Sequence, residues 1–343
     1  MPIITFSPRA IAKELLVGLP QRSKSVLTGR YGLSGSQERT LDAIGKEYGI
    51  TRERIRQIEN HGLGLIRDSE SYEEHAPKLV DLKRVLEQLG GIVSEEIVLQ
   101  EVPKSQADRN HLLFLLTVGH HFEDRRENND FYRRWHVDTQ LSDAVERALK
   151  MLHESVDSDT LTPEEEFIQL FSRFLKDEGV KPREPEVVVR WLLLSKRLNK
   201  NPLGEWGRAD SPHVRLKNTR DYAYLTLKRH GSPMHFREVA LAIKKLFGRT
   251  VHPATTHNEL IKDDRFVLVG RGLYALKEWG YNPGVVREVI KGVIEREGAL
   301  TREEIIERVK RERYVKDATI TVNLQSGSFT RLPDGKYVIA QKK

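Results

Sequence analysis

Four polar side chains lie close together in the stretch "GITRERIRQIENHGLGLIR" (Gly49–Arg67): Arg52, Glu53, Arg56 and Gln57. On a helix, these spacings place all four on the first two turns. Arg can bind guanine O6 and N7, Gln can pair with adenine, and a carboxylate can accept a hydrogen bond from cytosine N4. The set is therefore suited to reading base edges in a DNA major groove. The alternative is a surface helix with solvated ion pairs, such as a network that joins Arg52, Arg56 and Glu59.

Two helices joined by a tight turn are expected to position this set. Apolar residues recur at helical spacing on both sides of "YGIT", at Leu41, Ile44 and Tyr48 before it and at Ile55, Ile58 and Ile66 after it. Gly49 can take the left-handed conformation of the turn, Ile50 can fill the corner, and Thr51 can cap the second helix. The pattern predicts a helix-turn-helix, in which the first turns of the second helix enter the major groove.

The segment "VLTGRYGLSGSQERTLDAIGKEYGITRERIRQIENHGLGLIR" (Val26–Arg67) resembles region 4 of primary sigma factors, the domain that reads the −35 promoter element. The resemblance implies base contacts by Arg52, Glu53 and Gln57. It implies that Arg54 and Arg56 lie at or near the DNA backbone, and Thr51 completes the predicted DNA-binding set. RNA polymerase is a further candidate partner, since region 4 of sigma factors cradles the polymerase flap.

Two features depart from that family. Where primary sigma factors usually have basic residues and alanine, this chain has His61, Gly62, Gly64 and Leu65. The two glycines are expected to fray the helix, at about 1 kcal/mol each relative to alanine. The resemblance also begins as early as Val26, which leaves no room before it for polymerase-clamp and promoter-melting domains. We therefore expect a chain that is not a complete sigma factor.

A repeated pattern follows the predicted helix-turn-helix. Two helices joined by a glycine-containing turn are predicted at Leu86–Val102, Leu227–Ile243 and Ile294–Val309, with a looser copy at Leu175–Leu192. A third helix and a pair of strands should follow each copy. The strand pairs are clearest at Arg265–Trp279 and Ser328–Ala340, and His120–Val137 has the same form. Three helices and a two-stranded wing describe a winged helix, and the recurrence strengthens the interpretation.

The segment Gly231–Tyr281 resembles the HARE-HTH family, a winged-helix-like module found in the delta subunit of bacterial RNA polymerase and in restriction-associated and chromatin proteins. The likeness is carried by "PMHFREVALAI", "TTHNEL" and "FVLVGRGLYAL". Its third helix is expected at Ala254–Ile261. The candidate DNA-binding residues there are Thr255, Thr256, His257 and Asn258, flanked by Arg265, Arg271 and Lys277. The alternative is that Thr255 and Asn258 only cap and solvate the helix.

The fold class expected is mainly α with small β wings: an N-terminal helix-turn-helix domain followed by three or four winged-helix-like domains. The predicted domains are a sigma region 4-like domain at 1–75, a winged-helix-like domain at 76–137, a helical or winged-helix-like domain at 138–212, a HARE-HTH domain at 213–281 and a C-terminal winged helix at 282–343. In the last domain the polar candidates are Lys316, Thr319, Thr321 and Asn323, with Arg331 and Lys336 on the wing.

Charge divides these domains into two groups. The chain of 343 residues carries a net charge of +7. Residues 213–281 hold 13 Lys or Arg against six Asp or Glu, and residues 282–343 hold 13 against nine, whereas residues 138–212 hold 11 against 15. Basic character at the C-terminal end favours an anionic partner there. The middle segments are expected to act as spacers or protein contacts. Alternatively, the excess charge serves solubility.

Several classes of protein are disfavoured. The absence of cysteine excludes disulfides, thiol nucleophiles and thiolate zinc sites. Neither GxxxxGK[ST] nor GxGxxG occurs, and the acidic and histidine residues of "HFEDRRENNDFYRRWH" (His121–His136) fit a wing better than a metal site. No apolar run approaches the roughly 18 residues that span a bilayer. We therefore expect no enzyme, cofactor, metal, membrane contact or small-molecule substrate, and a cytoplasmic, nucleoid-associated protein.

The function expected is sequence-specific binding of double-stranded DNA in transcription regulation. Two alternatives remain open. One is an architectural nucleoid protein that coats or bridges DNA without sequence preference. The other is the DNA-sensing component of a restriction or defence system.

Overall fold

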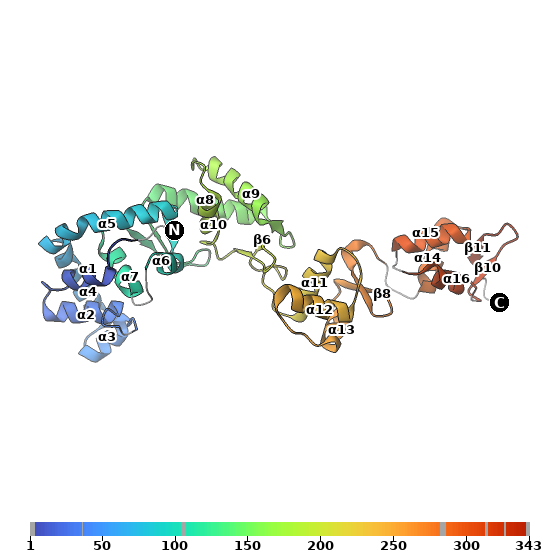
Figure 1. Ribbon diagram of the computed structural model, residues 1–343, viewed down its shortest axis with the longest axis horizontal. Helices are drawn as coiled ribbons and strands as arrows, with labels where there is room; N and C mark the ends of the chain where they lie inside the picture. Colours follow the sequence, from blue (N-terminus) through green and yellow to red (C-terminus); the bar gives the residue numbers. More distant parts are fainter. Residues whose placement is uncertain are drawn as a thin grey trace. The chain divides into compact units, whose positions relative to one another are not determined.

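The computed structural model describes residues 4–35, 37–103, 108–281, 286–312, 315–325 and 327–340. Helices dominate these residues, and each sheet among them is small and antiparallel (Figure 1). The chain divides into two compact units, Met1–Val214 and Arg215–Lys343. None of the described helices is long and apolar enough to cross a membrane.

The first four helices form what we call the head: α1 (Pro8–Leu15), α2 (Gln21–Tyr31), α3 (Leu41–Tyr48) and α4 (Arg52–Arg67). The predicted helix-turn-helix is α3 and α4. Gly49 ends α3 in the left-handed conformation, with φ of 64°. The Thr51 hydroxyl caps α4 by accepting a hydrogen bond from the Arg54 backbone nitrogen at 3.2 Å. Under this corner Ile50 packs against a small cluster of Val26, Ile44 and Ile55.

After the head come four successive segments, called here repeats 1 to 4. The order helix, strand, helix, helix, strand, strand occurs in repeats 1 to 3, and repeat 4 has the same order without the first strand. Repeat 1 contains α5 (Glu70–Leu89), β1 (Ile92–Ser94), α6 (Glu95–Glu101), α7 (Arg109–Val118), β2 (Glu123–Arg125) and β3 (Arg134–His136). Repeat 2 contains α8 (Thr139–Ser155), β4 (Thr162–Pro163), α9 (Glu164–Asp177), α10 (Pro185–Leu192), β5 (Leu198–Lys200) and β6 (Glu205–Arg208).

Repeat 3 contains α11 (Thr219–His230), β7 (Met234–His235), α12 (Phe236–Phe247), α13 (Pro253–Lys262), β8 (Phe266–Gly270), β9 (Leu273–Leu276) and the short 3-10 helix η2 (Lys277–Trp279). Repeat 4 contains α14 (Val286–Glu297), α15 (Arg302–Glu312), α16 (Asp317–Leu324), β10 (Phe329–Arg331) and β11 (Tyr337–Ile339). Its first strand is reduced to a single bridge between Leu300 and Tyr337.

The sheets share one topology. In repeats 1 to 3 the last strand lies in the middle, in the orders β1-β3-β2, β4-β6-β5 and β7-β9-β8. In repeat 4 the last strand β11 likewise pairs with β10 and bridges Leu300. The predicted turn glycine between β10 and β11, Gly335, has φ of 86°.

One predicted copy was misaligned. The segment Leu175–Leu192 holds the end of α9 and the whole of α10, which are the second and third helices of repeat 2, not the first and second. The true connection from α8 to α9, residues 156–163, contains no glycine, so a pattern based on a glycine turn does not detect it.

The head and repeat 1 share a single hydrophobic core. It includes Leu27 and Leu63 from the head together with Leu79 of α5 and Phe114 of α7. The Tyr31 ring meets the Phe114 ring edge-on, with centroids 5.4 Å apart. A domain boundary was predicted at residue 75, but that position falls inside α5, which runs unbroken through it. The burial of α7 against the head explains why the chain does not separate there.

Arg67, in the last turn of α4, reinforces this contact. Its guanidinium donates hydrogen bonds to the carbonyl oxygens of Thr117 and Val118, at 2.8 and 2.9 Å. These carbonyls lie at the end of α7 and have no partner further along the helix. Arg67 therefore joins the C-terminal ends of α4 and α7, and positions the helix that carries the predicted DNA-reading residues.

Repeats 1 and 2 are also packed together. Trp191 of α10 is fully buried, and its indole nitrogen donates a hydrogen bond to the Gly90 carbonyl oxygen at 3.2 Å. Phe131, between β2 and β3, forms a bridge with Ser195. These contacts explain why residues up to Val214 form one compact unit.

Candidate nucleic-acid interface

The first two turns of α4 present the predicted polar set to solvent. Arg52, Glu53, Arg54, Arg56 and Gln57 are all exposed, as is the capping residue Thr51. Ile55, in the middle of the set, is fully buried in the corner of the helix-turn-helix. The helix is therefore amphipathic at its start, with a polar outer face held in place by an apolar inner one. The structure brings together all six residues predicted for this helix.

Four of these side chains pair with one another. The Arg56 guanidinium binds the Glu53 carboxylate with two hydrogen bonds, at 2.6 and 2.9 Å. This hydrogen bonding holds the pKa of the Glu53 carboxyl below its usual value. The Arg54 guanidinium donates to the Gln57 amide oxygen at 2.9 Å. Surface pairs of this kind contribute little stability, so their polar groups can be redirected to a ligand at low cost.

The alternative network through Glu59 does not form. Glu59 is buried, and it accepts a hydrogen bond from the Tyr31 hydroxyl at 3.1 Å and lies 3.6 Å from the Arg30 guanidinium. Burial raises the pKa of the Tyr31 hydroxyl, and the Glu59 carboxylate raises it further. Glu59 thus ties α4 to α2. Its position four residues after Ile55 on the apolar face would have revealed this role, but sequence reasoning placed it among surface ion pairs.

The prediction that α4 frays at Gly62 and Gly64 was wrong, because the helix continues to Arg67. At Gly62 a Cβ atom would lie 3.1 Å from the Leu27 Cδ1 atom and 3.2 Å from the Ser23 Cβ atom. These distances are tighter than ordinary packing. Gly62 therefore lets α2 approach α4 closely, and this packing offsets the low helix propensity of glycine.

The third helices of repeats 1 and 2 face inward. In α7 most side chains are buried: His111, Leu112, Leu113, Phe114, Leu115, Leu116 and Val118. In α10 the buried residues Val188, Trp191 and Leu192 are accompanied by Arg190, which forms an ion pair with Glu101 of α6 at 3.4 Å. Neither helix has a polar face free for DNA.

The third helix of repeat 3, α13, presents only half of its predicted polar set. Thr255 and Asn258 are exposed. Thr256 is fully buried, and its hydroxyl donates to the His252 carbonyl oxygen at 3.3 Å. The His257 ring stacks on Phe236 at 4.4 Å and meets Tyr274 edge-on at 5.8 Å. Thr256 and His257 are thus part of the packing of this repeat, which corrects their assignment as DNA-reading residues.

The flanking cations of repeat 3 also fall into two groups, one paired and one exposed. The Arg265 guanidinium is held by Asp221 at 2.9 Å and by Asp263 at 2.7 Å, over the Tyr224 ring. Arg265 is therefore a structural residue, because its charge is already neutralised by two carboxylates. Arg271 and Lys277 are exposed, and neither has an ion-pair partner within the described ranges. These two remain candidates for phosphate contact.

In repeat 4, Lys316 just before α16 and Thr319 on α16 are exposed as expected. Thr321 and Asn323 differ from the expectation. The Thr321 hydroxyl donates to the Asp317 carbonyl oxygen at 2.9 Å, and the Asn323 amide donates to the Thr319 carbonyl oxygen at 2.8 Å. Both side chains are half-buried and bonded to their own helix, so they are poorly placed to read bases.

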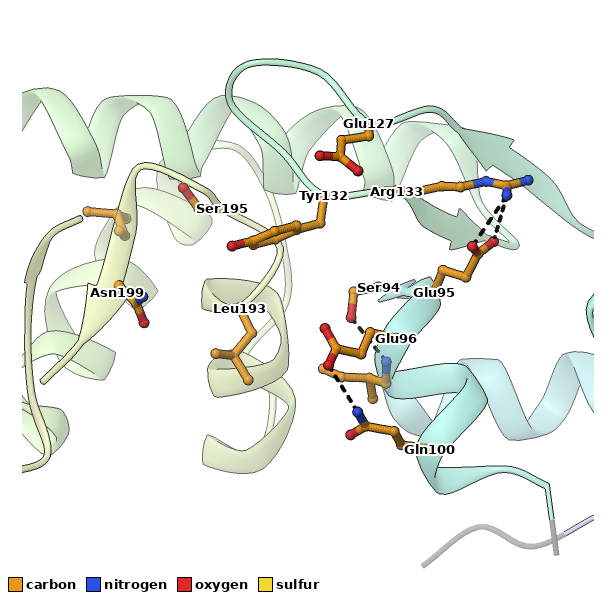
Figure 2. A pocket seen from close by; sticks show the side chains of 12 residues that line it. Ser94, Glu95, Glu96, Gln100, Glu127, Tyr132, Arg133, Leu193, Ser195 and Asn199 are labelled. Carbon is orange, nitrogen blue, oxygen red and sulfur yellow. Dashed lines mark hydrogen bonds and ion pairs between the residues drawn. The ribbon is translucent and has the colours of Figure 1, made fainter. Parts of the chain in front are cut away.

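A surface pocket of about 470 Å³ lies where repeats 1 and 2 meet (Figure 2). Its walls include Glu95 and Glu96 of α6 on one side and Leu193 on the other. Glu95 accepts hydrogen bonds from Arg133 and from the Trp135 indole, and Glu96 accepts one from Gln100. The carboxylates of Glu95 and Glu96 repel phosphate, so this pocket is unsuited to binding nucleic acid.

Within the described ranges, no three His, Asp or Glu side chains are placed to hold a metal ion together. In the segment His121–His136, three of the acidic residues are instead paired with cations. Asp124 lies 3.3 Å from Arg133, Asp130 lies 3.1 Å from Arg197, and Glu127 pairs with Lys196.

The head is similar to a domain of known proteins. Residues 15–68 match the family described as sigma-70, region 4. The RNA polymerase principal sigma factor HrdD of Streptomyces viridifaciens is 54% identical over 50 residues, and the same-named protein of Streptomyces coelicolor is 52% identical over 50 residues. In both comparisons the match covers 15% of this chain and 15% of the relative. The likeness therefore concerns one domain.

Proposed function

We propose that this protein is a sequence-specific double-stranded-DNA-binding regulator of transcription, which reads bases with the first two turns of α4. The observation that carries the proposal is the exposed set of Arg52, Glu53 and Gln57 at the start of the second helix of a helix-turn-helix. The family match of residues 15–68 supports it. We further propose that the protein is not an enzyme and that it associates with the nucleoid.

Repeats 1 to 4 have the element order and strand order of winged helices, and we assign them that fold. Repeats 1 and 2 then act as a spacer with buried third helices. Repeats 3 and 4 supply basic surfaces, with the larger excess in residues 213–281, where 13 Lys or Arg stand against six Asp or Glu. A DNA contact by repeat 3 is supported by this charge, by the exposed Arg271 and Lys277, and by the resemblance to HARE-HTH modules.

The test is to select the preferred site of the full chain from a random DNA pool and then to measure binding of variants. Arg52→Ala and Gln57→Ala should each weaken binding to that site by about 1–3 kcal/mol while sparing random DNA, because each removes one base contact. Arg9→Ala is the matched control, since Arg9 is an exposed arginine on α1 of the same head. Glu53→Ala should relax specificity more than it lowers affinity, because it also removes repulsion of phosphate.

Equal losses on selected and random DNA would show that α4 only anchors phosphates. A chain that binds DNA with no sequence preference would be an architectural protein instead. Dependence of binding on base methylation would favour a role in restriction or defence.

RNA polymerase is the second partner that we propose, on the strength of the region 4 match. The head cannot offer all of its apolar surface to it, because Ile11, Leu27 and Leu63 already pack in the core shared with repeat 1. The test is to measure how much RNA polymerase copurifies with the full chain and with its Arg52→Ala variant. Because Arg52→Ala weakens DNA binding, polymerase that still copurifies with the variant is held by a direct contact and not through bridging DNA. Loss of polymerase after nuclease treatment would contradict a direct contact.

A further inference from the structure

The third helices of repeats 3 and 4 expose the same kind of surface. In α13 the buried positions are Thr256 and Leu260, and in α16 they are Ile320 and Leu324. When the two helices are aligned on these buried positions, an alanine followed by a threonine precedes the first of them in each: Ala254 and Thr255 in α13, Ala318 and Thr319 in α16. All four of these preceding residues are exposed.

Each helix adds one large aliphatic side chain to this exposed face. Ile261 of α13 is 61% exposed, and Val322 of α16 is 65% exposed. Ile261 follows Asn258 by three residues, and Val322 follows Thr319 by three, so each aliphatic side chain lies on the same helix face as the exposed polar residues. The outer faces of both helices are therefore rich in methyl groups and carry few strong hydrogen-bonding groups.

In this alignment Val322 corresponds to Asn258 and Ile261 to Gln325, so the two aliphatic side chains lie at different positions along the same exposed side of the helix. One exposed aliphatic residue is ordinary, whereas one on the third helix of each basic domain points to a shared use of that side. Lys262 follows Ile261 directly, and Lys316 precedes α16; both are exposed. Lysine beside the methyl-rich face favours a partner that carries negative charge around an apolar contact point. DNA has this character in its major groove, where the thymine C5-methyl group is the apolar mark on base edges flanked by phosphates.

We propose that α13 and α16 recognise A·T base pairs through contact of their aliphatic side chains with thymine C5-methyl groups. Ile261 and Val322 are the main contacts, and Ala254, Thr255, Ala318 and Thr319 add further methyl contacts. Asn258 can donate to and accept from adenine on the same helix face. The inference rests on the proposed DNA-binding function, and it assigns to repeats 3 and 4 a chemistry unlike the charged hydrogen bonding of α4.

Replacing thymine by uracil tests this inference, because uracil lacks only the C5-methyl group. The full chain is first used to select its preferred site from random DNA. The selection is then repeated with the Arg52→Ala and Gln57→Ala variants. The A·T positions that these variants still prefer are assigned to repeats 3 and 4. Uracil is then placed at those positions, and the dissociation constants of the two duplexes are compared at one salt concentration.

We expect the uracil duplex to bind about fourfold more weakly for each contacted methyl group, which is the effect of withdrawing one methylene-sized group from contact. In Ile261→Ala and in Val322→Ala, binding to the thymine duplex should fall and the penalty for uracil should shrink. Leu241→Ala is the matched control, because Leu241 is 69% exposed on α12 of the same repeat but lies off the third helix. It should leave both dissociation constants unchanged.

Two results would overturn the inference. If the chain keeps a preferred site but binds thymine and uracil duplexes equally, the proposed function stands and methyl recognition by α13 and α16 is wrong. The aliphatic faces would then belong to a protein contact. If the chain selects no preferred sequence at all, both the proposed function and this inference fail.

Discussion

Repeats 1 and 3 have the same order of elements and the same strand order, yet they use their third helix in opposite ways. In repeat 1, α7 is buried in the core that it shares with the head. In repeat 3, α13 buries only Thr256 and Leu260 and leaves its outer face open. The comparison shows that the topology does not decide whether a third helix can meet DNA. The side chains of that helix, and the neighbour they pack against, decide it.

Charge follows the same division. Residues 138–212 hold 11 Lys or Arg against 15 Asp or Glu, whereas residues 213–281 hold 13 against six. The segment whose third helix is buried carries a negative excess, and the segment whose third helix is exposed carries a positive one. Because phosphate contact requires cations on an accessible surface, both properties favour our proposal that a second DNA contact lies after Val214.

Truncation should have the largest effect on folding and on DNA binding. A fragment that ends at residue 75 cuts α5 and lacks α7, so Leu27, Leu63 and Tyr31 lose their partners in the shared core. We expect it to lack cooperative unfolding and site-specific binding. A fragment of residues 1–214 should fold and bind the same core sequence as the full chain, but at least about tenfold more weakly, because the second contact is missing. Circular dichroism melting and DNA titration measure both.

A second test compares one buried and one exposed third-helix residue. Phe114→Ala should reduce the free energy of unfolding of the N-terminal unit by about 3–5 kcal/mol, because Phe114 is fully buried against Tyr31. Ile261→Ala, at a side chain that is 61% exposed, should change stability by less than about 0.5 kcal/mol. Hydrogen exchange of the α4 and α11 amides reports the two units separately. Similar losses would contradict the division into buried and exposed third helices.

A third test separates the cations of repeat 3. Arg271→Ala or Lys277→Ala should weaken binding on every DNA sequence and reduce the salt slope by about one unit, as expected for a lost phosphate contact. Arg265→Ala should instead destabilise repeat 3, because Asp221 is 4% exposed and would keep a buried carboxylate without its arginine. Titrations at several salt concentrations, with a thermal melt of each variant, distinguish the two roles. An unchanged salt slope for Arg271 and Lys277 would indicate a protein partner for this repeat.

The smallest effect is expected from two glycines on α4. Gly64→Ala should stabilise the N-terminal unit by about 0.5–1 kcal/mol, because nothing lies within 4 Å of the new Cβ atom and alanine favours the helix. Gly62→Ala should gain less or lose stability, since Leu27 and Ser23 must move. Denaturant unfolding of both variants gives the difference. Equal gains would show that α2 and α4 do not need the close approach at Gly62.

Short-range signals in the sequence were sufficient to predict the helix-turn-helix of the head. Gly49 and Thr51 act on their own turn, and the spacing of Ile44 and Ile55 shows which sides of α3 and α4 face inward. The hairpin turn at Gly335 likewise depends on residues adjacent to it in the sequence. Such features depend on backbone conformation and on neighbours within a few residues. They can therefore be predicted without knowledge of the rest of the fold.

Only the tertiary structure decided which polar and apolar groups are free. Arg265 is paired with Asp221 across 44 residues of sequence, and Tyr31 of the head meets Phe114 of repeat 1. The exposure of Ile261 likewise depends on what packs around α13, whereas α7 is buried by the head. A guanidinium or an aliphatic side chain looks the same in the sequence whether it is paired, buried or free. Its availability depends on long-range contacts, which residue type and spacing do not specify.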